Sequence, residues 1–95
     1  MDKIEEAFNR LMKTQDGWRK IAAVMISPIR HKLKDLYALD MTKEQEVIVE
    51  AEVYKASIME DAGISVFGYK EAVRLQDKLV DEFKGQTPQV QYEGN

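Results

Sequence analysis

The stretch VMISPIRHKL, residues 24–33, decides how many helices the chain makes. It places Pro28 inside a run whose apolar residues otherwise have the spacing of one amphipathic helix. Proline lacks an amide hydrogen and its ring crowds the preceding backbone, so Ser27 is driven away from helical geometry. Serine is also a good N-cap, and proline is favoured at the first helical position. The pair predicts that one helix ends and another begins here; a single helix kinked at Pro28 is the alternative.

The residues before this stretch predict a short first helix and a turn. Asp2 and Glu5 form a capping-box-like pair at the start of an amphipathic segment that stops near Lys13. The sequence TQDG, residues 14–17, has turn chemistry. Within it, Asp16 is placed to cap the next helix.

A further helix is predicted after the short connection that follows Leu39. Thr42 and Gln45 have the spacing of a second capping box, and Gly63 suits the end of the helix. We expect its core side to be one apolar line: Val47, Ala51, Tyr54 and Ile58, widened by Ile48 and Met59.

The last helix is predicted from about Tyr69 to Lys84, because the glycine that follows suits a helix end. We therefore expect an all-α fold, a small bundle of four to five helices. The helical domain is predicted over residues 1–85. A polar, extended C-terminal tail, residues 86–95, is expected to be flexible or bound to a partner.

The composition argues against an enzyme. The 95 residues include no cysteine and one histidine, so cysteine nucleophiles, disulfides and cysteine-based zinc sites are excluded. Any catalytic triad would have to use His31, the one histidine. No di-iron, EF-hand or phosphate-loop motif is present. We expect no catalytic residue, no metal site, no cofactor and no small-molecule substrate.

Charge is distributed unevenly along the chain. The net charge is −3 overall, but residues 16–39 sum to +3 and residues 40–62 to −5. These blocks predict complementary faces that meet within one molecule or between molecules; solvated helix faces are the alternative. Arg30 and Lys34 share a face of the basic block and are candidate protein contacts.

Apolar residues outside the helices give a second set of candidate contacts. Val66 and Phe67 lie in a loop with more apolar bulk than solvation requires, so they plug the end of the bundle or anchor a partner. Trp18 likewise either packs in the core or contacts a partner. Tyr92 in the tail has strand-like spacing and could add to the sheet edge of a neighbour.

Nucleic-acid binding is the alternative function. Lys70, Arg74 and Lys78 form a basic line on the last predicted helix. The segment EDAGISVFGYKEAVRL, residues 60–75, loosely has the order of a helix-turn-helix. The helix before it is longer than that motif uses, and the chain as a whole is acidic.

Residues 8–30, FNRLMKTQDGWRKIAAVMISPIR, resemble the N-terminal arm region of some tailed-phage major capsid proteins. The resemblance rests on an amphipathic start, a Gly-Trp-Arg-Lys-Ile-Ala-like segment and the Pro28-Ile29-Arg30 sequence. It implies a phage-encoded protein that works by assembly. The capsid fold is not extended to this chain, since those proteins are several times longer and rich in sheet. No site residue carries over.

These patterns together predict a small, non-enzymatic helical protein that binds other proteins, as a homo-oligomer or as an accessory part of a larger assembly. No run approaches the ~20 apolar residues that span a bilayer. The sequence MDKIEEAFNR also lacks the apolar core of a signal peptide. We therefore expect no membrane partner, and a location in the cytoplasm or in a virus particle assembled there.

Overall fold

The computed structural model describes residues 2–58, 60–61, 64–65 and 67–86. In this part of the chain the backbone forms four helices: α1 (Lys3–Met12), α2 (Gly17–Tyr37), α3 (Lys43–Ile58) and α4 (Tyr69–Lys84). Between α3 and α4, the strand β1 (Glu60–Asp61) pairs antiparallel with β2 (Ile64–Ser65). Strands of two residues form no layer of their own, so the predicted all-α fold is confirmed.

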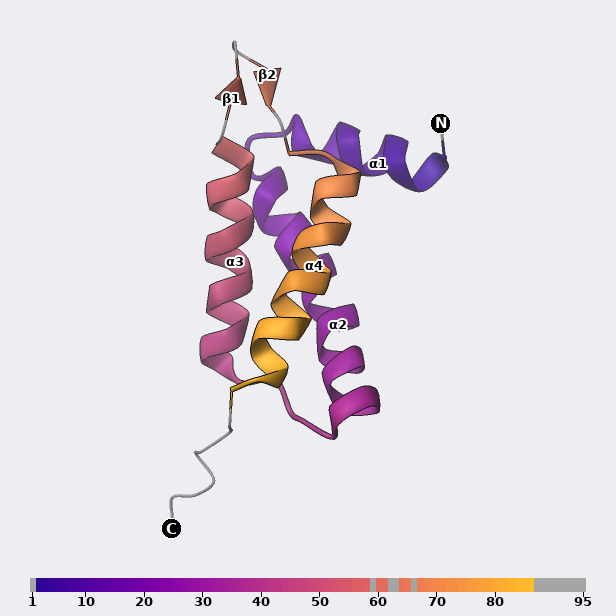
Figure 1. Ribbon diagram of the computed structural model, residues 1–95. Coiled ribbons are helices and arrows are strands. Elements are labelled where there is room, and N and C mark those ends of the chain that lie inside the picture. The colour runs from indigo at the N-terminus through magenta and orange to yellow at the C-terminus, as the bar shows by residue number, and fades with distance from the viewer. Residues whose placement is uncertain (1, 59, 62–63, 66, 87–95) are drawn as a thin grey trace.

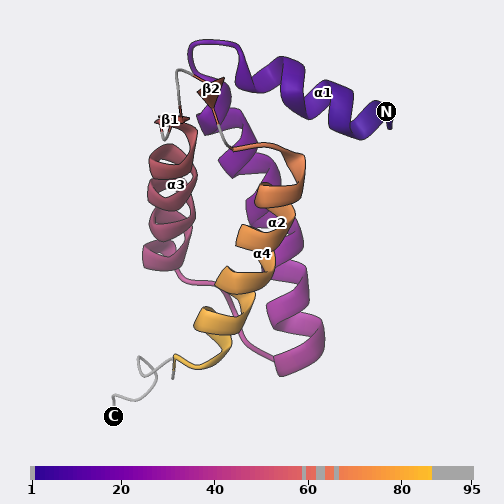
Figure 2. The ribbon, with the colours of Figure 1, turned by 45° about the horizontal axis from the view of Figure 1, so that its top comes forward.

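Three of the helices form a bundle. α2, α3 and α4 run side by side, and α1 lies across the end where α2 begins (Figures 1 and 2). α2 is the central element, because it packs more extensively than any other helix against the other three. The core lies where α2, α3 and α4 meet, and its largest fully buried side chains are Phe83, Ile29, Leu33, Leu79, Val49 and Val53.

The predicted break at Ser27-Pro28 is wrong, because α2 continues through Pro28 as one helix. The missing amide and the ring clash of a proline cost a helix about 3 kcal/mol. Met25, Ile29 and Leu33 lie on one buried line that crosses Pro28 without interruption. Burying each such side chain contributes about 1.5–3 kcal/mol, so continuous packing outweighs the proline penalty. The chain has four helices in its described part, the lower of the two expected numbers.

Helix caps fix where α1 and α3 begin. Asp2 accepts a hydrogen bond from the Ile4 amide at 2.8 Å, as predicted. The capping box is confirmed as well: the Gln45 amide donates to Thr42 Oγ1 at 3.1 Å, and the Thr42 amide donates to Gln45 Oε1 at 2.9 Å. Asp16 occupies the N-cap position of α2 without making the capping bond. Its carboxylate instead lies 3.8 Å from the Lys20 ammonium.

The turn between α1 and α2 depends on Gly17. A Cβ at this position would lie 2.0 Å from the carbonyl oxygen of Leu11, far inside van der Waals contact. The Thr14 hydroxyl donates to the same oxygen at 2.7 Å. This close approach brings the apolar side of α1 against the end of the bundle.

Candidate protein-interaction surface

α3 carries apolar residues on two opposite sides. Its inner side contacts α2 and α4 through Val49 and Val53, both fully buried. The predicted core line lies on the other side, where Val47 is 61% exposed, Tyr54 45% and Ile58 58%. Ala51, in the same line, is exposed too. The prediction that this line faces the core is therefore wrong. We call these four residues the α3 outer line.

Polar contacts on the first turns of α3 explain which side turns inward. Glu46 forms an ion pair with Arg30 of α2. The Gln45 side-chain amide donates to Gln86 Oε1 at 2.8 Å, just beyond the end of α4. These contacts join α3 to α2 and to the residue that lies just beyond α4. Because either apolar side of α3 could cover a core, such contacts favour the observed rotation of the helix.

Trp18 extends the outer line toward α2. Its ring meets the Tyr54 ring edge to face, with centroids 4.9 Å apart, and the Arg19 guanidinium lies 5.2 Å from the Trp18 centroid. The indole is half-buried: one part of it packs against the core, and the rest stays exposed at the surface. Between Trp18 and the outer line lies a shallow depression of about 270 Å³. The apolar surface is thus wider than a single helix face.

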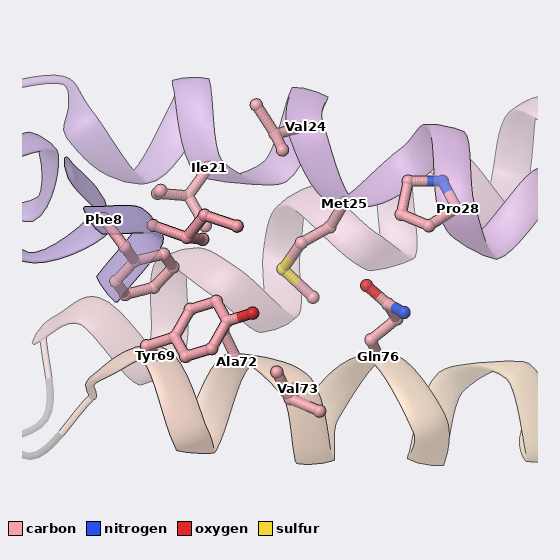
Figure 3. Close-up of a pocket in the computed structure, with 10 residues that line it drawn as sticks. Phe8, Ile21, Val24, Met25, Pro28, Tyr69, Ala72, Val73 and Gln76 are labelled. Atoms are coloured by element: carbon pink, nitrogen blue, oxygen red, sulfur yellow. The ribbon is translucent and has the colours of Figure 1, made fainter. Parts of the chain in front are cut away.

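A second apolar surface lies between α1, α2 and α4. This groove has a volume of about 400 Å³, and its partly exposed lining includes Ile4, Val24 and Val73. Figure 3 shows Met25 of α2 and Gln76 of α4 pointing toward each other across it. At one end the Phe8 ring packs against Tyr69 with centroids 5.8 Å apart. Its lining is mostly apolar, and the polar groups in it are the Gln76 amide and the Tyr69 hydroxyl.

The charge blocks meet within the molecule. Arg30 pairs with Glu46, and the Lys34 ammonium lies 3.1 Å from Asp40. Arg30 and Lys34 were predicted as protein contacts, and the structure places both beside the start of α3, already engaged with carboxylates. These two ion pairs show that the basic block, residues 16–39, contacts the acidic block, residues 40–62, within one molecule.

The structure separates the remaining predicted contacts. Phe67 is only 7% exposed and its ring lies 5.9 Å from that of Phe8, so it plugs the end of the bundle and is not a surface anchor. Val66 and Tyr92 lie outside the described residues, as does the tail beyond Gln86. Of the predicted protein-binding residues that the structure describes, Arg30 and Lys34 lie at the surface and Phe67 lies in the core.

The predicted basic line lies on α4, but acidic neighbours accompany it. Arg74 lies 3.1 Å from Glu71, and Lys78 lies 4.0 Å from Glu82. The Glu71 carboxylate accepts from its own backbone amide and from the Gly68 amide. These bonds lower the pKa of Glu71, and the Arg74 charge lowers it further. Lys70 is exposed on the same helix. This stretch of surface carries both signs of charge.

The helix-turn-helix interpretation does not match the connection between α3 and α4. That motif joins its helices by a turn of three or four residues. Here residues 59–68 separate the two helices and include the β1–β2 pair. The expected turn is therefore not formed.

Sequence reasoning missed the exposed outer line, although the signal was present. The stretch VIVEAEVY, residues 47–54, has valines that fall on both sides of a helix. A helix that is apolar all round is usually buried on all sides. That pattern indicates a second contact for α3.

The chain matches no protein-family model and is detectably similar to no curated protein and no solved structure. In the part of the chain that the structure describes, no helix is long and apolar enough to cross a membrane. Among the same residues, no three acidic or histidine side chains gather as they would around a metal ion.

Proposed function

We propose that the protein is a non-enzymatic association protein and that the α3 outer line is its contact surface. One observation carries the proposal: α3 exposes Val47, Tyr54 and Ile58 directly opposite the valines that it buries. Exposed apolar groups that gather in a line beside Trp18 are typical of a surface that another protein covers. The protein would act as a homo-oligomer or as an accessory component of a larger assembly.

The capsid-arm resemblance of residues 8–30 adds the hypothesis that this assembly belongs to a phage. Location in the cytoplasm or in a virus particle is part of the same proposal. The DNA-binding alternative has less support, because Arg74 and Lys78 lie beside carboxylates of their own helix. Low-salt binding assays with duplex DNA test that alternative directly.

Site-specific photo-crosslinking tests the proposal in cells that produce the protein. A photoreactive residue replaces Ala51 in the outer line or, as a matched control, Ala23, an exposed alanine of α2. We expect a crosslinked protein from position 51 and none from position 23. The product should disappear when Val47→Asp is added, because a charge in the line makes its burial costly. Equal yields at both positions, or none at position 51, would contradict the proposal.

A further inference from the structure

The outer line has the repeat of a helix that packs along another helix. Val47, Ala51, Tyr54 and Ile58 follow one another at spacings of four, three and four residues. Alternating spacings of four and three residues are those of the a and d positions of a heptad, which keep one seam of a helix facing a partner helix along its length. The geometry therefore favours a helix as the occupant of this face.

Two opposite charges stand on the two flanks of the line. At 3.6 residues per turn, Glu50 lies about 70° to one side of its centre and Lys55 about 70° to the other. Both side chains are exposed. Lys55 lies 3.1 Å from Glu52 on its own helix, an exposed contact that is easily exchanged. The two charges are five residues apart, which is the separation that pairs across parallel helices in a coiled coil.

We propose that the occupant is α3 of a second copy of the chain, parallel to the first about a two-fold axis. In this arrangement Glu50 of one copy faces Lys55 of the other, and the symmetry repeats the pair. Antiparallel copies would bring each flank against the same flank of the partner. Glu50 would then face Glu50 or Ser57, and both ion pairs would be lost.

Among the described residues, none of the other helices packs on this face. α2 and α4 pack on the inner side of α3, and Figures 1 and 2 show α3 at one edge of the bundle. Trp18 flanks the line on the Glu50 side, since both residues border the same depression. The approaching Lys55 of the second copy would therefore meet the Glu50 carboxylate beside the Trp18 ring, over which the Arg19 guanidinium already lies. One contact opposes the arrangement: Glu44, one heptad before Ala51, would lie near its counterpart at the exposed start of the seam.

This inference rests on the proposed association function and names its partner. Charge reversal tests it, with the dissociation constant measured by sedimentation velocity. Glu50→Lys and Lys55→Glu should each weaken self-association about tenfold, because both symmetry-related pairs become repulsive. The double variant E50K/K55E restores opposite charges and should recover the wild-type constant to within about threefold.

Arg74→Glu is the matched control for Lys55→Glu. Each breaks a pair of a carboxylate and an exposed cation three residues apart, at 3.1 Å in both cases. The control should leave self-association unchanged, and circular dichroism should show that all variants fold. A double variant as weak as either single one would overturn the parallel arrangement.

A disulfide provides a second readout. Because the sequence contains no cysteine, Ala51→Cys introduces the only thiol. Equivalent positions in a parallel seam are close enough for a disulfide, so mild oxidation should link two copies. Wild-type protein that stays monomeric and a cysteine variant that stays unlinked would overturn the second copy as partner. If position 51 nevertheless crosslinks to a different protein, the association function stands and only its partner changes; if it crosslinks to nothing, both fail.

Discussion

The two sides of α3 differ little in composition and completely in environment. Val49 and Val53 are fully buried, whereas Val47 and Ile58 on the opposite side are mostly exposed. Hydrophobicity alone therefore did not choose the side that faces the core. Two polar contacts favour the observed side: Glu46 with Arg30, and Gln45 with Gln86. The apolar side that these contacts leave outside is available to a partner.

The largest expected difference comes from the same substitution on the two sides. Val49→Asp should prevent folding, because a buried carboxylate without a partner costs several kcal/mol, comparable to the stability of a small domain. Val47→Asp should change the free energy of unfolding by about 0.5 kcal/mol or less, since its side chain stays in water. Urea unfolding, followed by circular dichroism at low protein concentration, measures both. Similar losses for the two variants would mean that α3 has no distinct inner and outer side.

The contacts that orient α3 should have an intermediate effect. Gln45→Ala removes half of the capping box and the bond to Gln86. We expect the free energy of unfolding to fall by about 1–2 kcal/mol, because the Thr42 backbone amide and the Gln86 side-chain oxygen both lose their partner. Gln76→Ala, in the groove between α2 and α4, is the control and should cost less in the same urea titration. If Gln45→Ala costs no more than the control, polar contacts do not hold the inner side in place.

A smaller effect of opposite sign is expected where α2 turns toward α3. Ala38 ends α2 with a φ of 54°, in the left-handed region that glycine adopts more easily than alanine. Its amide donates to the Lys34 carbonyl at 3.0 Å, so the conformation is held by a backbone bond. Ala38→Gly should stabilise the protein by about 0.5–1 kcal/mol. A lower melting temperature for this variant would show that the strain is absent.

Local sequence signals predicted the helices well. Asp2 and the Thr42–Gln45 pair cap α1 and α3 as expected, and α4 spans Tyr69–Lys84 as expected. These features depend on residues within one or two helical turns. Such short-range chemistry can be read directly from a sequence.

The errors arose where distant contacts decide the outcome. Pro28 is a local helix breaker, yet burial of Ile29 and Leu33 against other helices keeps α2 intact. The rotation of α3 depends on Arg30 and Gln86, which lie far from it in the sequence. Of the predicted binding residues, Phe67 lies in the core for a similar reason, because Phe8 of α1 packs on it. A periodic pattern cannot show which helix will cover it.

Sedimentation equilibrium of the wild-type chain beside Val47→Asp, from micromolar to near-millimolar concentration, tests the central claim most directly. We predict that the mass of the wild-type protein rises from that of one chain toward that of two, while Val47→Asp remains at one chain throughout. A wild-type protein that stays at the mass of one chain over the whole range would contradict self-association through α3. Equal association by both proteins would place the contact elsewhere.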